Sequence, residues 1–274
     1  MLGLKKKIAK NQAGGATLSQ SRLGAGGFED KPAPPKHIAF ICDGNRRWAK
    51  EHGLPPLEGH RAGIANFEKL VDWYIAHGVS TVTFFIFSTE NWDRSTEEIN
   101  FLMNLFYLEM KKNLKHAIEK NLRYRIVGER SRLPKKLADM CDKLERDSAE
   151  NTNGTVVFAL NYGGQDEIVR AVKDIVESEI PAKNITKEIF EAFMDTGELL
   201  PIDMMVRTSN ENRISNFLLW KLAYAELYFV PEHWPTLVRD KKIWIRVLDE
   251  FAKRNRRFGG GKEKDYSGKK KGKK

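Results

Sequence analysis

The sequence of 274 residues has two cysteines, Cys42 and Cys141, and it lacks long apolar runs. Two cysteines cannot build a disulfide framework, and no Cys/His spacing resembles a zinc site, so reduced thiols are the simplest interpretation. The longest apolar runs, such as residues 82–87, are far shorter than the ~20 residues that cross a bilayer. No secretory signal or cleavage pattern is present near the N-terminus. These absences predict a soluble, cytoplasmic protein.

Positive charge is abundant overall but not in the middle of the chain, although the formal net charge is +10. Residues 1–36 and residues 262–274 each hold seven basic and two acidic residues, so residues 37–261 are formally neutral. This distribution argues against nucleic-acid binding by the folded part. We predict a flexible basic leader over 1–36, one folded domain over 37–261 and a Lys-rich, disordered tail over 262–274. The tails either contact anionic membrane lipids peripherally or simply keep the protein in solution.

Short apolar, β-prone runs alternate with longer helical patterns between the tails. The predicted strands are 37–42, 79–87, 123–127, 155–160, 203–207 and 225–230, and the clearest helix is 63–77, ended by Gly78. This alternation predicts a single α/β domain with a central, mostly parallel six-stranded sheet flanked by helices. Ligands of such sheets bind beyond the carboxyl ends of the strands, so residues that follow the strands are the first candidates for a site.

A charged turn follows the first predicted strand. Asp43, Gly44 and Asn45 come directly after the strand, and Arg46 and Arg47 follow at the start of the next helix. A glycine turn leading into a helix exposes backbone N–H groups to an anion, and guanidinium groups match phosphate oxygens. Because an acid there would repel a bare phosphate, the arrangement indicates a diphosphate bound through Mg²⁺. A helix-capping Asp beside two surface arginines explains residues 43–50 equally well.

Two more polar clusters follow predicted strands. Residues 87–94 contain Phe87, Ser88, Glu90, Asn91, Trp92 and Arg94, and residues 207–215 contain Arg207, Arg213 and Ser215. A helix cap built by Ser95 or Thr96 with Glu98 explains the residues from 95 onward, but not Asn91, Trp92 and Arg94. Exposed arginines on a solvated loop are the ordinary alternative for the last cluster. Three such clusters at strand ends together predict an oxyanion site.

The helix after residue 95 is expected to carry a wide apolar face. Its members are Ile99, Leu102, Met103, Phe106, Tyr107 and Met110, flanked by Leu105 and Leu114. Core packing is the better explanation for each residue taken alone. Beside a diphosphate site, the same face could line a slot for an alkyl or isoprenoid chain.

With these residues in hand, the sequence resembles the cis-prenyltransferases, the family of undecaprenyl diphosphate synthases. The resemblance covers residues 37–260 in order, through HIAFICDGNRRWAK, LEGHRAG, FFIFSTENWDR, RIVGERSRLPKKL, FALNYGG, VRTSNENRISNFLLWKLAYAELYF, HWP and RRFGG. The DDxxD motif of trans-type synthases does not occur. The resemblance implies a homodimeric α/β enzyme whose catalytic domain, over 37–261, holds a parallel sheet beside a hydrophobic tunnel. Such enzymes extend an allylic diphosphate with isopentenyl diphosphate, form a Z double bond and release pyrophosphate.

The resemblance also implies residue roles. Asp43 and Asn91 would be catalytic, and Asp43 would hold Mg²⁺ with help from Glu226. The residues expected to bind substrate are Gly44, Asn45, Arg46, Arg47, Trp48, His60, Phe87, Ser88, Glu90, Trp92, Arg94, Arg207, Arg213, Ser215, Arg257 and Gly259. Among them, Arg207, Arg213 and Ser215 would bind isopentenyl diphosphate. Arg257 and Gly259 belong to a C-terminal element that reaches the neighbouring subunit's site in this family.

Some positions depart from the family pattern. Pro56 stands where many members carry a phosphate-binding Arg, and we hypothesise that Arg46 compensates. Ile86 stands where long-chain members often have Ala, which predicts a short or medium product. The alternative function is a non-catalytic partner subunit of a heteromeric enzyme. The presence of Asp43, of the loop over 207–215 and of Glu226 argues against that alternative.

Overall fold

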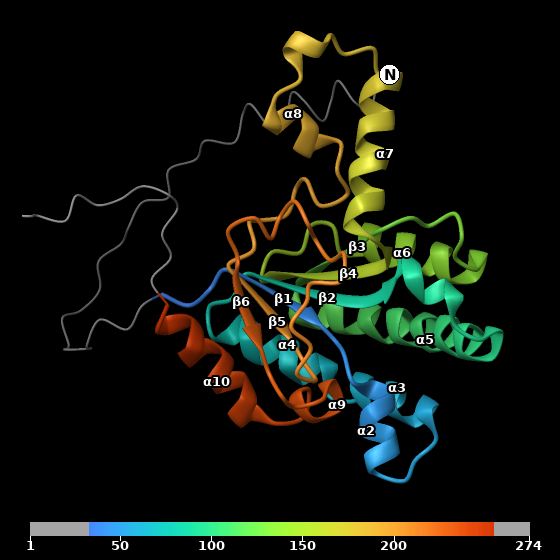
Figure 1. Ribbon diagram of the computed structural model, residues 1–274, viewed down its shortest axis with the longest axis vertical. Coiled ribbons are helices and arrows are strands. Elements are labelled where there is room, and N and C mark those ends of the chain that lie inside the picture. Colours follow the sequence, from blue (N-terminus) through green and yellow to red (C-terminus); the bar gives the residue numbers. More distant parts are fainter. Residues whose placement is uncertain (1–32, 255–274) are drawn as a thin grey trace, which may run out of the picture.

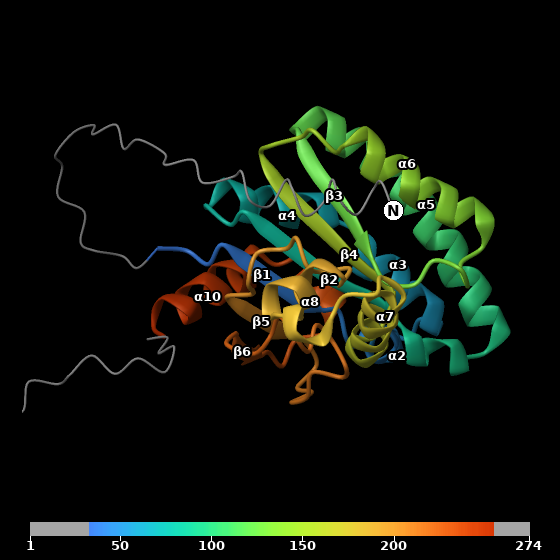
Figure 2. The same cartoon turned by 90° about the horizontal axis from the view of Figure 1, so that it is seen from above.

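Six strands form the centre of the fold in the computed structural model, which describes residues 33–254. They are β1 (His37–Ile41), β2 (Thr81–Ser88), β3 (Leu122–Val127), β4 (Gly154–Tyr162), β5 (Met204–Arg207) and β6 (Glu226–Phe229). The strands lie in the order β3-β4-β2-β1-β5-β6, and every neighbouring pair is parallel (Figures 1 and 2). The predicted α/β domain with a six-stranded sheet is therefore confirmed, and each predicted strand overlaps an observed one.

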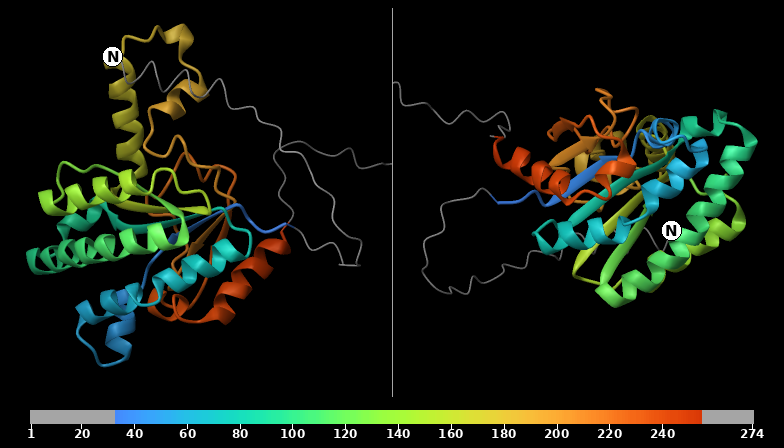
Figure 3. Two further views of the ribbon diagram at one scale, coloured as in Figure 1. Left: turned by 180° about the vertical axis from the view of Figure 1, so that it is seen from behind. Right: turned by 90° about the horizontal axis from the view of Figure 1, so that it is seen from below.

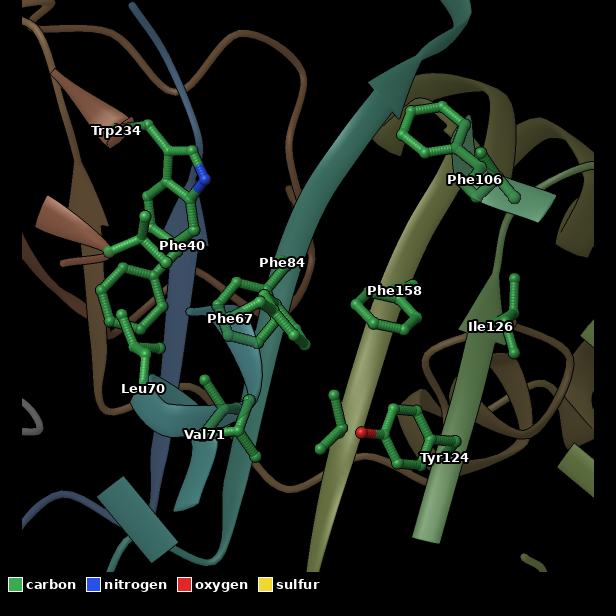
Figure 4. Close-up of a cluster of buried hydrophobic side chains, with 14 of the residues drawn as sticks. Phe40, Phe67, Leu70, Val71, Phe84, Phe106, Tyr124, Ile126, Phe158 and Trp234 are labelled. Carbon is green, nitrogen blue, oxygen red and sulfur yellow. The ribbon is translucent and has the colours of Figure 1, made fainter. Parts of the chain in front are cut away.

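Both faces of the sheet are buried, which explains why its strands are apolar almost throughout. Successive side chains of a strand point to opposite faces. Phe40, Phe84 and Phe158, from three adjacent strands, join the larger core on one face (Figure 4). On the other face, Ala39 and Phe85 join a smaller core with residues of the segment 199–222.

Helices cover both faces of the sheet. They are α2 (Asn45–Glu51), α3 (Pro56–Ile64), α4 (Phe67–Ala76), α5 (Thr96–Lys120), α6 (Lys135–Asp147), α7 (Gly164–Glu177), α8 (Lys187–Ala192), α9 (Trp234–Leu237) and α10 (Lys241–Ala252). Helices α4, α5 and α10 lie on one side, and α7 with α8 rises from the other (Figures 1 and 3). None of the helices within residues 33–254 is long and apolar enough to span a bilayer.

The helix predicted over 63–77 was wrong in one respect, because two helices share this segment. Helix α3 ends at Ile64, and α4 begins after Asn66, whose φ of 72° lies in the left-handed region. A side chain at Gly63 would collide with Asn45 and Trp234, so the end of α3 packs closely against the residues beyond β1. The break lets α3 cover that edge of the sheet while α4 follows the core. Gly78, with φ of 88°, follows the end of α4 as predicted.

The sheet order determines where a ligand would bind. The chain runs from β1 to β2 on one side and returns much later to β5 on the other side of β1. Crevices form at such switch points, beyond the carboxyl ends of the strands. Asp43 follows β1, and Arg207, paired with Ile41 in the sheet register, ends β5. The predicted tails lie outside the described residues, except for positions 33–36.

Candidate active site

The carboxylate of Asp43 and the guanidinium of Arg207 meet at the switch point. The Arg207 Nη2 group donates to Asp43 Oδ2 over 2.9 Å, and the backbone N–H of Gly44 donates to Oδ1 over 2.7 Å. Thr208 fixes the backbone of Asp43 twice, since its Oγ1 accepts from the Asp43 N–H and donates to the Asp43 carbonyl. The side chain of Asp43 is 30% exposed and that of Arg207 is 4% exposed. The carboxylate is therefore rigidly held but open to a ligand.

The surroundings of Asp43 favour its ionised form. Burial alone raises the pKa of this carboxyl, but the hydrogen bond and charge of Arg207, the Gly44 N–H and the charge of Arg47 outweigh burial. The pKa of Asp43 consequently lies below its ordinary value. An ionised carboxylate between two guanidinium groups can hold a divalent cation while the arginines bind anionic oxygens.

Gly44 forms the turn between β1 and α2. Its φ of 96° is unfavourable for residues with a side chain, and a Cβ there would lie 1.8 Å from Ser209 Oγ. After this turn, Arg47 Nη2 lies 3.3 Å from Asp43 Oδ1, while its Nη1 lies 2.9 Å from Glu211 Oε1. Helix α2 has only seven residues. An anion at this turn would therefore be bound mainly by side chains rather than by the backbone of the helix.

A second basic cluster forms around Glu98 in the first turn of α5. Arg94 Nη1 lies 2.9 Å from Glu98 Oε1, His60 Nε2 lies 3.4 Å from that oxygen, and Arg46 Nη1 lies 3.6 Å from Oε2. Burial followed by the charge of Arg94 lowers the pKa of His60 to about 4, although Glu98 opposes the shift. The imidazole is therefore neutral near pH 7, and its N–H group can donate a hydrogen bond to a phosphate oxygen.

Residues after β2 border the same space. Ser88, Glu90 and Asn91 line it together with the buried ring of Phe87. The Asn91 Oδ1 atom accepts from the Ser88 N–H over 3.1 Å, which closes a capping turn. Trp92 instead packs inward, where its indole N–H donates to Asn161 Oδ1 over 2.7 Å.

The loop after β5 contributes the remaining predicted groups. Arg207 Nη1 donates to Ser215 Oγ over 2.7 Å and also to the Arg213 carbonyl. The Arg213 side chain lies at the rim, 61% exposed, and pairs with Glu211. Glu211 thus pairs with both Arg47 and Arg213.

These groups surround the mouth of a cavity of about 540 Å³. The polar residues at its wall include Asp43, Asn45, His60, Ser88, Asn91, Arg94, Arg207 and Ser215, and the apolar residues include Phe67, Leu102, Leu105, Phe106, Met110 and Phe158. The apolar face predicted for the helix after residue 95 is divided. Leu102, Leu105, Phe106 and Met110 line the cavity, whereas Met103 is buried in the core and Ile99, Tyr107 and Leu114 pack against it.

Unpartnered polar atoms mark the cavity as a site for a polar ligand. Asn45 Oδ1, His60 Nε2 and Arg207 Nε are buried without a hydrogen-bond partner among the described residues. A buried polar atom without a hydrogen bond destabilises the folded protein, unless water or a ligand supplies the bond. A diphosphate at the mouth would accept from the imidazole and guanidinium N–H groups.

Besides the inward-packed Trp92, two more predicted residues lie away from this centre. Trp48 stacks on His52, with ring centroids 4.0 Å apart, and Arg239 covers it. Glu226 begins β6, level with Met204 rather than with Arg207, and pairs with Arg254 over 2.9 Å. Within one chain, Glu226 is therefore not brought to Asp43. Arg257 and Gly259 lie outside the described residues.

A magnesium ion fits the donor set around Asp43. Residues 33–254 contain no group of three or more His, Cys, Asp or Glu side chains that could hold a metal by themselves. Mg²⁺ commonly binds through one or two carboxylates, with water and substrate phosphates completing its coordination. A single exposed carboxylate at a diphosphate-binding mouth meets that requirement.

Two acidic residues escaped the sequence-based prediction of the site. Glu98 belongs to the helix cap that the sequence predicts, since the Glu98 N–H donates to Ser95 Oγ over 3.3 Å. Its carboxylate nevertheless collects three basic side chains from three segments. Glu211 was counted within the loop but given no role. The sequence did carry a signal for both. Each is an acidic residue close to arginines that are predicted to bind phosphate, and its negative charge can balance theirs.

The fold and the site together define an enzyme that acts on a diphosphate carrying a hydrocarbon chain. The carboxylate of Asp43 and several arginines stand at the mouth of a cavity with apolar walls, an arrangement that suits both parts of such a substrate. The chain belongs to the undecaprenyl diphosphate synthase family: the family described as "Putative undecaprenyl diphosphate synthase" matches residues 41–259.

Known proteins agree with this assignment. An isoprenyl transferase of Agrobacterium fabrum is 40% identical over 229 residues, covering 82% of this chain and 92% of the relative. A ditrans,polycis-undecaprenyl-diphosphate synthase of Vibrio cholerae, specific for (2E,6E)-farnesyl diphosphate, is 41% identical over 82% of this chain and 91% of the relative. The crystal structure of lavandulyl diphosphate synthase from Lavandula x intermedia, in complex with dimethylallyl diphosphate, superimposes with a TM-score of 0.79. Its identity is 29%, and the match covers 83% of this chain and 99% of the lavender enzyme.

Proposed function

We propose that this protein is a cis-prenyltransferase that condenses isopentenyl diphosphate with an allylic diphosphate. The products are a Z-polyprenyl diphosphate, a precursor of carrier lipids, and pyrophosphate. The observation that carries the proposal is the position of the Asp43–Arg207 pair at the mouth of the apolar cavity. One end of this space suits two charged headgroups, and the other suits a growing hydrocarbon chain.

The basic residues at the mouth support cleavage of the allylic C–O bond. Negative charge develops on the departing pyrophosphate, and Arg47, Arg94 and Arg207 are already oriented toward it by their carboxylate partners. Asp43 would hold Mg²⁺, which when bound supplies further stabilisation of phosphate charge. Because these groups are fixed before the substrate arrives, little reorganisation is needed as the bond breaks.

The apolar wall supports formation of the new C–C bond. The electron-poor allylic fragment must be shielded from water, and the buried rings of Phe87, Phe106 and Phe158 supply apolar wall to the cavity. The hydrogen-bonded pair of Arg207 and Ser215 would bind the second headgroup. The proton lost from the condensed product passes either to the released pyrophosphate or to a nearby polar side chain.

A direct assay tests this function. Purified protein is incubated with labelled isopentenyl diphosphate, Mg²⁺ and allylic primers of increasing length, and the dephosphorylated products are sized by chromatography. We expect labelled polyprenyl products that depend on both primer and Mg²⁺. Absence of product with every primer, despite a folded protein, would contradict the proposal and favour the non-catalytic partner subunit.

We further propose that the working form is a homodimer, as the family resemblance implies. Helix α7 stands clear of the sheet (Figure 1). The exposed Val169, Val172 and Val176 are spaced so that they share one face of this helix. Exposure of this apolar stripe to water is unfavourable, and packing against a second copy of the chain would bury it. Sedimentation equilibrium should show a dimer that Val172→Lys weakens, and a monomer at assay concentration would contradict this proposal.

The proposal for cellular location is a cytoplasmic protein whose basic tails contact anionic lipid headgroups. Each well-placed Lys or Arg contributes about 1 kcal/mol to such binding. Co-sedimentation with anionic vesicles, lost at high salt and absent with neutral vesicles, is the expected result. Equal recovery with both kinds of vesicle would leave the tails with a solubilising role.

A further inference from the structure

A hydrogen-bonded relay of Ser209, His233 and Glu51 adjoins the Gly44 turn. Ser209 Oγ lies 2.6 Å from His233 Nδ1, and His233 Nε2 lies 3.0 Å from Glu51 Oε1. The three residues come from the loop after β5, the residue before α9 and the end of α2. Exposure rises outward along the relay, from 3% at Ser209 to 61% for the Glu51 side chain.

The chemistry of the groups fixes the direction of the relay. An ionised carboxylate accepts only, so His233 Nε2–H donates to Glu51. With a neutral ring, Nδ1 then accepts from the Ser209 hydroxyl. The same order of groups occurs in serine hydrolases, where the hydroxyl must face a substrate. Here Ser209 is buried and does not line the cavity, and its Oγ abuts the Gly44 backbone. There is no room for an electrophile at this oxygen.

The relay instead packs directly against the Gly44 turn. It occupies the space that a Gly44 side chain would need, since a Cβ there would lie 1.8 Å from Ser209 Oγ and 2.5 Å from His233 Nδ1. The carbonyl of Ser209 accepts from Arg47 Nη1 over 3.3 Å, and its N–H donates to the Glu232 carbonyl over 2.9 Å.

The backbone at Ser209 needs such support. Its φ is 74° and that of the following Asn210 is 58°, both in the left-handed region that disfavours side chains. The hydroxyl–imidazole bond helps to hold this conformation, and the conformation in turn presents the Ser209 carbonyl to Arg47. The relay thus connects one strained loop to both Gly44 and Arg47.

We propose that Ser209, His233 and Glu51 are positioning residues that hold the Gly44–Arg47 turn in the geometry that the allylic diphosphate requires. The inference rests on the proposed function, because that function assigns the turn to the allylic substrate. None of the three residues need touch the substrate. They act through the backbone of the turn and through the guanidinium of Arg47.

Steady-state kinetics of Ser209→Ala and His233→Ala test the proposal. Each variant should raise the KM for the allylic diphosphate about three- to tenfold, the effect of losing one neutral hydrogen bond. The kcat and the KM for isopentenyl diphosphate should stay within about twofold of the wild type. Glu51→Gln should have a smaller effect in the same direction, because its end of the relay is exposed.

The double variant separates a relay from two independent contacts. If the residues act as one unit, Ser209→Ala/His233→Ala should be no worse than the more severe single variant. Matched controls are Ser178→Ala and His77→Ala, which remove a hydroxyl and a ring whose hydrogen bonds go to carbonyls of the adjoining helix turn. Additive effects, or equal rises in both KM values, would overturn the proposal. So would a loss of thermal stability without any kinetic change.

Calorimetric titration with magnesium pyrophosphate distinguishes failure of the relay from failure of the proposed function. This probe binds without any prenyl transfer. Weaker binding by Ser209→Ala and His233→Ala supports the relay even if the wild type makes no product. Unchanged binding overturns the relay, even if the wild type is an active prenyltransferase.

Discussion

At the scale of single residues, the position of a residue at the end of a predicted strand was a better guide to the centre of the site than to its rim. Asp43 follows β1 and Arg207 ends β5, both next to the switch point, so the parallel sheet alone brings them together. The direction of Trp48 depends on which face of the short α2 meets Arg239, and sequence carries no signal for that contact. Glu98 was hidden because its role as a helix cap already explained it. Contacts between side chains that are far apart in the sequence can be recognised only in the folded structure.

Arg46 is the residue expected to replace the Arg that is missing at position 56. In the structure, Pro56 starts α3, and Arg46 lies on the neighbouring α2, 3.6 Å from Glu98. Arg46→Ala should raise the KM for the allylic diphosphate about tenfold, since a hydrogen bond to a charged group is lost, and leave kcat nearly unchanged. Lys50→Ala, one turn later on α2, is the control. An unchanged KM would show that Arg46 does not compensate.

Glu98 is expected to orient Arg46, His60 and Arg94 before substrate binds. Glu98→Gln keeps the size of the side chain but removes the charge, so the basic groups should lose their common anchor. We expect kcat to fall about tenfold or more, with no rise in the allylic KM because the freed cations still attract the diphosphate. Glu97→Gln, an exposed neighbour in the same turn, provides the control. A variant with unaltered kcat would argue that the cluster orients itself without Glu98.

At the scale of elements, the strands were predictable and one helix boundary was not. Strands buried on both faces are short apolar runs that stand out from the helical pattern around them. The apolar stripe over 63–77 gave no sign of a break, because the break depends on the close approach of Gly63 to Asn45 and Trp234. That approach is a tertiary contact. The same break places α3, with His60, over the cavity.

The β2 strand carries the residue expected to limit product length. Ile86 lines the cavity, and the resemblance associates a small residue there with long chains. We propose products of fewer than about ten isoprene units for the wild type, given a cavity in the range of ordinary ligand pockets. Ile86→Ala should shift the longest products upward on thin-layer analysis, because the wall recedes. Ile99→Ala, partly buried outside the cavity wall, is the control. Wild-type products longer than that limit would refute this idea.

At the scale of the whole molecule, one sheet with a core on each face supports the site, and buried histidines make it sensitive to acid. Burial lowers the pKa of His37 to about 4 and is also the main cause of the pKa of about 4 at His60, both from an ordinary value of 6.5. Between pH 6.5 and pH 4, the unfolded chain therefore binds protons that the folded protein does not. The free energy of unfolding should fall as the pH decreases through this window. Above pH 6.5, neither histidine affects it.

Urea unfolding from neutral pH to pH 4 measures this effect. The wild type should lose stability steadily in that range, and His37→Gln should show a shallower dependence, whatever its stability at neutral pH. His77→Gln, at an exposed position, is the matched control. A wild-type curve that stays flat down to pH 4 would contradict the assignment of neutral, buried imidazoles.

The proposed function requires the carboxylate of Asp43 to join a divalent cation to the diphosphate of the allylic substrate. The most direct measurement is the Mg²⁺ dependence of pyrophosphate release by the wild type and by Asp43→Asn, which keeps the shape of the side chain and removes its charge. The account predicts at least a ~100-fold loss of rate in the variant, with the fold and thermal stability largely retained. Wild-type rates from Asp43→Asn, with the same dependence on Mg²⁺, would contradict it.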